Sequence, residues 1–244
     1  MTARHRAEKA ASFGRVVGDY VHGRPAYPEA AVQWLLEGAA RAVDAGAGTG
    51  KLTLPASSLV REVVAVEPQE SMVRQLNRSV PAARCLCARA EALPLVSGWA
   101  DVVVAAQAFH WFDRARALPE IARVLRPGGR LSLVWNVRDE SVEWVAQLSR
   151  IAGADNSVET RRGLDQVRGF GAFETRVFRW GQVLDRDSLL AHVRSRSNVA
   201  SLPGPDREKV MDEVGRLCDT NSDLATRDHF ELPYITEAYR APKL

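Results

Sequence analysis

VDAGAGTGK, at residues 43–51, is the segment that decides the fold. A short apolar run leads directly into three alternate glycines, Gly46, Gly48 and Gly50, and this pattern predicts a strand that turns sharply into a helix. Glycine has no β-carbon, so the backbone can take positive φ and a ligand can approach it closely, while the next helix begins with unpaired N–H groups. The segment therefore predicts a loop that holds an adenosine-type cofactor, with a tight turn that binds nothing as the alternative.

A phosphate-binding loop is excluded by the residues around the glycines. That loop requires a glycine five positions before the Gly-Lys pair and a Ser or Thr directly after it. The chain has Ala45 and Leu52 at these two positions, and Thr53 comes one residue too late. The ligand is therefore not expected to be held by its phosphates in this way.

The remaining choice lies between a dinucleotide and S-adenosylmethionine. The dinucleotide motif places a third glycine where Lys51 stands, which counts against it. Glu67 ends the apolar run 63–66, where a carboxylate can accept both ribose hydroxyls, and this feature fits either ligand. Asp44, before the first glycine, suits a ligand with an amine and repels a pyrophosphate. These residues favour S-adenosylmethionine, which carries an ammonium and a sulfonium, and they leave a nicotinamide-dependent oxidoreductase as the alternative.

Five blocks of sequence resemble, in their order and spacing, the class I S-adenosylmethionine-dependent methyltransferases with a methyltransferase type 11 domain. The similarity is to the small-molecule subgroup of ubiquinone/menaquinone and trans-aconitate methyltransferases. The blocks are VDAGAGTGKLT at 43–53, VVAVEP at 63–68, ARAEALPL at 88–95, DVVVAAQAFHWFD at 101–113 and RVLRPGGRLSLVWN at 123–136. The resemblance implies methyl transfer from S-adenosyl-L-methionine to an O, N or C atom of a small molecule, with S-adenosyl-L-homocysteine as the product.

Alternating apolar and amphipathic segments from residue 41 to about residue 150 predict an α/β fold with a parallel sheet. In this part we expect strands at 41–45, 62–67, 83–87, 100–106 and 130–136, and a helix at 114–125 after which Gly128-Gly129 turns the chain into the fifth strand. Beyond residue 150 we expect a strand at 173–184, a helix at 186–196, a helix capped by Asp206 and a strand element at 229–239. The resemblance implies a Rossmann-like, doubly wound sheet of seven strands, the last antiparallel, with helices on both faces.

Three parts of the chain are expected to differ in role. Residues 1–40 form an N-terminal arm and first helix over the cofactor site, 41–150 form the S-adenosylmethionine-binding core, and 151–244 complete the sheet and shape the acceptor site. In the resembled family a comparable arm lies over the cofactor, which implies that Tyr20 or Arg24 contacts the methionine carboxylate, for which an Arg fork is well suited. The alternative is that these residues only pin the arm to the domain.

Composition indicates an ordinary globular protein. The 244 residues are 46% hydrophobic and 26% charged, the net charge is +3, and the charges of both signs are interleaved, so no nucleic-acid partner is expected. No apolar run approaches the roughly 18 residues of a membrane helix and no secretory signal is evident, which predicts no membrane insertion and a cytoplasmic location. Three cysteines without a further ligand cluster predict no metal site. We expect a monomer or homodimer.

The cofactor is expected outside the carboxyl ends of the strands. The loop backbone would lie against its amino-acid half, Asp44 would take its ammonium, and Glu67 would hold its ribose. Pro68 is expected to be a further cofactor-binding residue. Met72 would cover the adenine, with core packing as the alternative. Arg89 departs from the family pattern, so the adenine edge is assigned to Ala90 and Glu91. The expected loop residues are Gly46, Ala47, Gly48, Thr49 and Gly50.

The segment 106–113 carries a dense group of aromatic and polar residues at the end of a predicted strand, so it is expected to line the place where donor meets acceptor. Gln107 would hydrogen-bond the donor or the backbone, and Phe109, His110 and Trp111 would contact the substrate. His110 is the candidate general base; the alternative is a structural histidine that caps the next helix. A catalytically silent, cofactor-binding regulatory module is the alternative to an enzyme.

Overall fold

The computed structural model describes residues 25–153, 160–161, 163–164 and 167–244. These residues fall into two compact units, each built from separate stretches of the chain. The first, here the sheet unit, contains Ala26–Asn136, Asn156–Phe178 and Thr236–Leu244. The second, here the helical unit, contains Val137–Asp155 and Arg179–Ile235. Three strands cross from one unit to the other, so each unit is described separately.

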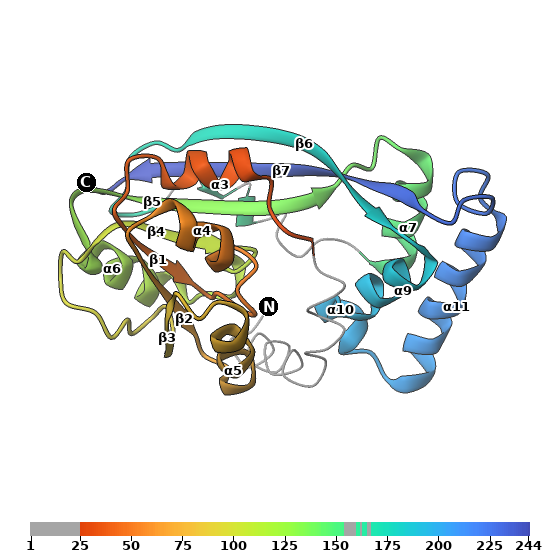
Figure 1. Cartoon of the computed structure of the whole chain (residues 1–244), viewed down its shortest axis with the longest axis horizontal. Helices are drawn as coiled ribbons and strands as arrows, with labels where there is room; N and C mark the ends of the chain where they lie inside the picture. Colours follow the sequence, from red (N-terminus) through yellow and green to blue (C-terminus); the bar gives the residue numbers. More distant parts are fainter. Residues whose placement is uncertain (1–24, 154–159, 162, 165–166) are drawn as a thin grey trace. The chain divides into compact units, whose positions relative to one another are not determined.

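The sheet has seven strands in the order β3-β2-β1-β4-β5-β7-β6. Strands β1 to β5 pair in parallel, and β7 runs antiparallel to its neighbours, as Figure 1 shows. The doubly wound α/β fold with an antiparallel last strand is thus confirmed. The order reverses between β1 and β4, which is the place where ligands bind in open sheets of this kind. The strand bounds are β1 Arg41–Ala45, β2 Glu62–Glu67, β3 Arg84–Cys87, β4 Ala100–Ala106, β5 Leu125–Arg138, β6 Glu174–Leu184 and β7 Phe230–Pro242.

The helices of the sheet unit bury apolar faces against these strands. Val32 and Leu35 of α3 and Ala56 of α4 join the core formed with Val102 and Val104 of β4. A smaller cluster packs α5 on β2. The bounds are α3 Glu29–Leu36, α4 Thr53–Leu59, α5 Glu70–Ser79, a short 3₁₀ turn η2 at Phe109–Trp111 and α6 Arg114–Val124.

Two local expectations in this unit are wrong. Gly128-Gly129 is not a turn ahead of a strand that begins at Arg130, because β5 already pairs with β4 at Leu125, and the register shifts between Ala100 and Val102. Such a shift lets the extra residues of one strand be accommodated within the sheet. His110 does not cap the next helix either. Asp113 is the N-cap of α6, and its carboxylate accepts a hydrogen bond from the Ala115 N–H at 3.2 Å.

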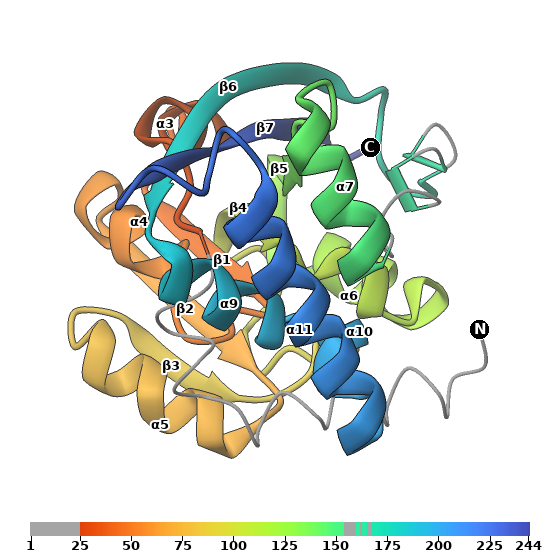
Figure 2. The same cartoon turned by 90° about the vertical axis from the view of Figure 1, so that its right-hand side faces the viewer.

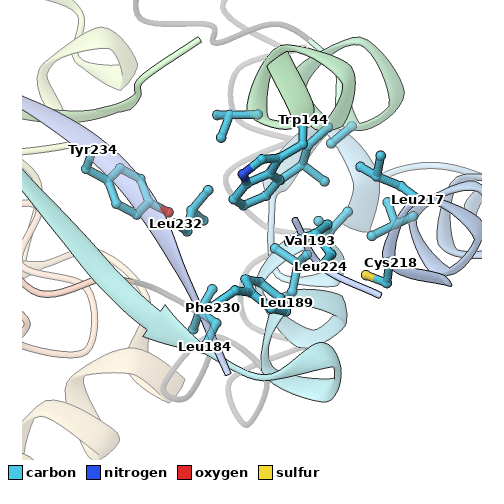
Figure 3. Packing of buried hydrophobic residues seen from close by; sticks show 14 of the residues in the cluster. Trp144, Leu184, Leu189, Val193, Leu217, Cys218, Leu224, Phe230, Leu232 and Tyr234 are labelled. Carbon is cyan, nitrogen blue, oxygen red and sulfur yellow. The ribbon is translucent and has the colours of Figure 1, made fainter. Parts of the chain in front are cut away.

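In the helical unit, α11 packs against both α7 and α9, as Figure 2 shows. Its core is apolar and includes Trp144, Leu189 and Phe230 (Figure 3), with the Trp144 and Phe230 rings edge to face at 5.8 Å. Asp206 does not cap a helix as expected, because α11 already begins at Gly204 with a proline in its first turn. The bounds are α7 Glu143–Ala152, α9 Arg186–Arg194, α10 Ser197–Ala200 and α11 Gly204–Thr220.

No helix in the described part of the chain combines the length and the apolar character needed to cross a membrane.

Replacing Gly50 by Ala is expected to lower the free energy of unfolding by about 2 to 5 kcal/mol. Gly50 has φ +92°, and an added Cβ would lie 2.5 Å from Leu76 Cδ1, so left-handed strain and overpacking both contribute. Gly38 is the matched control, because it has φ +69° but no atom within 4 Å of the added Cβ, so Gly38→Ala should cost only about 1 to 2 kcal/mol. Urea unfolding measures both, and equal losses would contradict the packing role of Gly50.

Candidate functional site

The glycine loop follows β1 and is held by β2. The Gly46 and Ala47 N–H groups both donate to the Val66 carbonyl, at 2.8 and 3.1 Å. Gly46 has φ +74°, and a Cβ there would lie 2.6 Å from the Cβ of Ala108, so only glycine lets the loop pass this close to the end of β4. The loop is therefore fixed by its neighbours on both sides before any ligand arrives.

Glu67, the last residue of β2, is tied to this loop. Its Oε2 accepts a hydrogen bond from the Gly48 N–H and its Oε1 accepts one from the Gln69 N–H, both at 3.0 Å. The residue is only 5% exposed, and burial raises the pKa of its carboxyl while the two backbone hydrogen bonds oppose this. Each carboxylate oxygen has a further lone pair, so the fixed carboxylate can still accept two hydroxyl groups.

Asp44 lies on β1, opposite Ala65 of the strand that ends at Glu67, and it is completely buried. Its Oδ2 accepts a hydrogen bond from Thr53 Oγ1 at 2.6 Å, whereas its Oδ1 has no hydrogen-bond partner among the described residues. Burial raises the pKa of Asp44 to about 7, Thr53 opposes the rise, and the Glu67 charge adds to it. Thr49 Oγ1 is likewise buried without a partner in the described part of the chain. A buried polar atom without a hydrogen bond lowers the stability of the fold. The unpaired oxygens of Asp44 and Thr49 therefore suit a polar or cationic group of a ligand.

Gln107 stands where β4 ends, in a backbone conformation that is rare for residues other than glycine, with φ +52°. Its Nε2 donates to the carbonyl of Asn136 at 2.8 Å, which realises the predicted backbone contact. Asn136 is a residue that the sequence did not point out. Its amide donates to the Ala26 carbonyl at 2.8 Å and accepts from Thr236 Oγ1 at 2.6 Å. Through its side chain and its backbone carbonyl, this one residue of β5 joins the start of the unit to the end of β4 and to β7.

The aromatic residues after β4 divide into two groups. Phe109 is completely buried and Phe112 is 7% exposed, and their rings pack edge to face at 5.8 Å, so both belong to the core. His110 and Trp111 are half-buried and have ring centres 4.8 Å apart. Substrate contact by Phe109, His110 and Trp111 stays a prediction, and for Phe109 the side chain is committed to packing.

Glu91, which is expected to lie at the adenine edge, has a carboxylate that two neighbours hold in place. Glu91 Oε1 accepts from the Asp113 N–H at 2.8 Å, and its Oε2 pairs with Arg89 Nε at 3.3 Å. Ala90 and Met72 are buried, at 4% and 3% exposure. Their assignment to adenine stays a prediction, as does the assignment of exposed Pro68 to the cofactor. Tyr20 and Arg24 lie outside the described residues.

Comparison with known proteins bears on this geometry. A family model described as a methyltransferase domain matches residues 43–133. An uncharacterized methyltransferase of Mycobacterium tuberculosis is 43% identical over 97% of both chains. A malonyl-[acyl-carrier protein] O-methyltransferase of Methylococcus capsulatus is 41% identical over 38% of this chain and 36% of its own. A solved structure from Anaeromyxobacter dehalogenans, assigned as a candidate type II methyltransferase, aligns with a TM-score of 0.64 at 26% identity over 90% of this chain and 96% of its own.

The buried Asp44 carboxyl should make stability depend on pH in the ligand-free protein. Between its ordinary pKa of 3.8 and its folded pKa of about 7, the unfolded chain releases a proton that the folded chain keeps. The free energy of unfolding of the wild type, relative to Asp44→Asn, should therefore fall as pH rises through this window, by up to about 4 kcal/mol. Urea unfolding at several pH values measures the difference.

Asp139→Asn is the control for this measurement. A hydrogen bond from the Ser141 side chain is the main reason that the pKa of Asp139 is lowered, so its ionisation does not oppose folding in this window. Its unfolding free energy should run parallel to that of the wild type above about pH 4. Parallel curves for Asp44→Asn as well would contradict the raised pKa.

Proposed function

Since this chain belongs to the S-adenosylmethionine-dependent methyltransferases of the type 11 domain family, we propose that it transfers the methyl group to an oxygen, nitrogen or carbon atom of a small-molecule acceptor. The transfer is a single in-line displacement. S-adenosyl-L-homocysteine is the second product. The dinucleotide alternative loses its support, because relatives that match 97% and 95% of the chain are named as methyltransferases or methyltransferase-like.

The single observation that carries this proposal is the arrangement of two buried carboxylates on either side of the glycine loop. Asp44 has an unpaired oxygen that suits the cofactor's ammonium, and Glu67 is held so that it can accept both ribose hydroxyls. Gly46 leaves the loop backbone bare where a Cβ would collide with Ala108. The residues present therefore fit a nucleoside that carries an amino acid.

The residues around β4 would prepare the reaction by position and by exclusion of water. When bound, the cofactor supplies an electrophilic methyl group on a positively charged sulfur, whose thioether needs no proton to leave. Gln107, fixed on the Asn136 carbonyl, holds the β4 end rigid, and the half-buried rings of His110 and Trp111 offer apolar surface and π-faces to a cation. Positioning and desolvation are then the main contributions of the protein.

An oxygen acceptor has additional support from one relative. The Methylococcus capsulatus protein is named for O-methylation of malonyl-[acyl-carrier protein], and it shares 41% identity with this chain over 99 residues. We include nitrogen and carbon because acceptor choice in such folds depends on residues outside the cofactor loop. A silent, cofactor-binding regulatory module is the competing function, and methyl transfer to a metabolite separates the two.

Glu67→Ala should weaken binding of S-adenosylhomocysteine by about 1.5 to 3 kcal/mol, because it removes charge-assisted hydrogen bonds to the ribose. Glu62→Ala is the matched control, since Glu62 is an exposed carboxylate at the opposite end of the same strand and its only described ion pair is a 3.9 Å contact with Arg41. Its affinity should equal that of the wild type. Isothermal titration calorimetry measures both, and an unchanged affinity of Glu67→Ala would show the ribose assignment to be wrong.

The reaction itself is tested with methyl-tritiated S-adenosylmethionine and a broad panel of metabolites. We expect calorimetric binding of S-adenosylhomocysteine, no comparable binding of nicotinamide dinucleotides, and transfer of label to a small molecule. Donor binding without labelling of any acceptor would favour the regulatory module. Dinucleotide binding without S-adenosylhomocysteine binding would overturn the proposed function.

A further inference from the structure

The two carboxyl oxygens of Asp44 have different surroundings. Oδ2 accepts the 2.6 Å hydrogen bond from Thr53 Oγ1, whereas Oδ1 has no hydrogen-bond partner among the described residues. Thr53 is the first residue of α4 and is completely buried, so its hydroxyl cannot turn to water instead. One oxygen of Asp44 is therefore held by the protein, and the other is left for a further partner.

This difference decides where a proton on Asp44 resides. A carboxylic acid carries its proton on one of its two oxygens. The Thr53 hydroxyl directs its hydrogen at Oδ2, so a proton on Oδ2 would either meet that hydrogen or turn it away from its acceptor. A buried donor without an acceptor lowers stability. The acid form of Asp44 therefore carries its proton on Oδ1, which is also the oxygen proposed to receive the cofactor's ammonium.

The surroundings of Asp44 favour the acid form in the ligand-free protein. The residues opposite Asp44 on its two neighbouring strands are Ala65 and Val104, which are both apolar. Burial raises the pKa of Asp44 to about 7, and the charge of Glu67 adds to the rise. At neutral pH, Asp44 is thus about half protonated.

Among the described residues, the titratable groups around Asp44 supply no counter-ion. Glu67 is itself acidic. The pKa of the Cys85 thiol on β3 is raised by burial and by the Asp44 charge, so this thiol is neutral at neutral pH. Lys51 follows the glycine loop, but burial alone lowers its pKa, so its ammonium is not paired with Asp44. Within the described part of the chain, the Thr53 hydrogen bond is what stabilises the Asp44 charge before a cation arrives.

We propose, on the basis of the methyltransferase function proposed above, that the cofactor binds by exchanging its ammonium for the proton on Asp44 Oδ1, and that Thr53 is the positioning residue that sets this exchange. The O–H bond of the acid breaks, its electron pair stays on the carboxylate, and the proton passes to solvent. An N–H of the ammonium then donates to Oδ1 while Oδ2 stays on Thr53. Because the proton and the ammonium compete for one atom, cofactor affinity rises with pH through neutrality.

Calorimetry of the full chain with S-adenosylhomocysteine, in buffers of different ionisation enthalpy, measures how many protons binding releases. We expect about 0.9 proton at pH 6 and about 0.1 at pH 8, and an affinity that rises about tenfold between these two values. Asp44→Asn keeps the shape of the side chain but cannot ionise, so it should release far fewer protons at pH 6. The same is expected for the wild type with 5′-methylthioadenosine, which keeps the nucleoside and the thioether but lacks the amino acid.

Thr53→Val and Thr53→Ser distinguish positioning from packing. Valine keeps the shape of threonine but lacks the hydroxyl, so the pH at which affinity is half-maximal should rise by about one unit. Proton release at pH 8 should then grow to about half a proton. Serine keeps the hydroxyl and loses a methyl group, so its midpoint should stay that of the wild type. If Thr53→Val does not fold, the proton release of the wild type and of Asp44→Asn still tests the exchange.

Three results would count against these assignments. A wild-type affinity that does not change between pH 6 and pH 8, or a heat of binding that is the same in every buffer, would overturn the exchange. Equal midpoints for Thr53→Val and Thr53→Ser would overturn the positioning role of Thr53. Absence of S-adenosylhomocysteine binding at every pH would overturn the proposed function and the exchange with it, so this failure is distinguishable from the other two.

Discussion

The hydrogen bond from the Gly48 N–H to Glu67 is the interaction on which the site depends. The parallel pairing of β1 with β2 brings the two strand ends side by side, with Ala45 opposite Val66. The loop after β1 can then donate to the Val66 carbonyl and to the Glu67 carboxylate at the end of β2. A carboxylate that accepts backbone N–H groups on both oxygens has one orientation, so the position proposed for the ribose is formed before any ligand arrives.

The two buried carboxyl groups beside this loop lower the stability of the ligand-free protein. Asp44 and Glu67 are both buried, their charges repel each other, and one oxygen of Asp44 has no partner in the described part of the chain. Nothing in the packing of β1 requires a carboxyl there, and an apolar residue would suit the core better. The cofactor ammonium proposed to bind Asp44 would remove this cost, and this would account for a destabilising residue at the centre of the sheet. Asp44 thus lowers the stability of the ligand-free protein at the position where it is proposed to bind the cofactor.

Local sequence predicted the parts of the fold that local patterns determine. Strands β1, β2 and β4 were predicted with their observed bounds, because apolar runs flanked by glycines and polar residues are short-range signals. The contacts of Asn136 and Trp135 could not be predicted in this way. Asn136 contacts residues 110 and 100 positions away, and Trp135 contacts His110, 25 positions away, so only the folded sheet brings these partners together.

A crystal structure of the full chain with S-adenosylhomocysteine tests the central claim most directly. The account predicts both ribose hydroxyls within hydrogen-bond distance of the Glu67 carboxylate, the Gly48 N–H still on Glu67, and the amino group of the ligand against the second oxygen of Asp44. A nucleoside bound elsewhere, or bound at the loop with Glu67 turned away from its sugar, would contradict it.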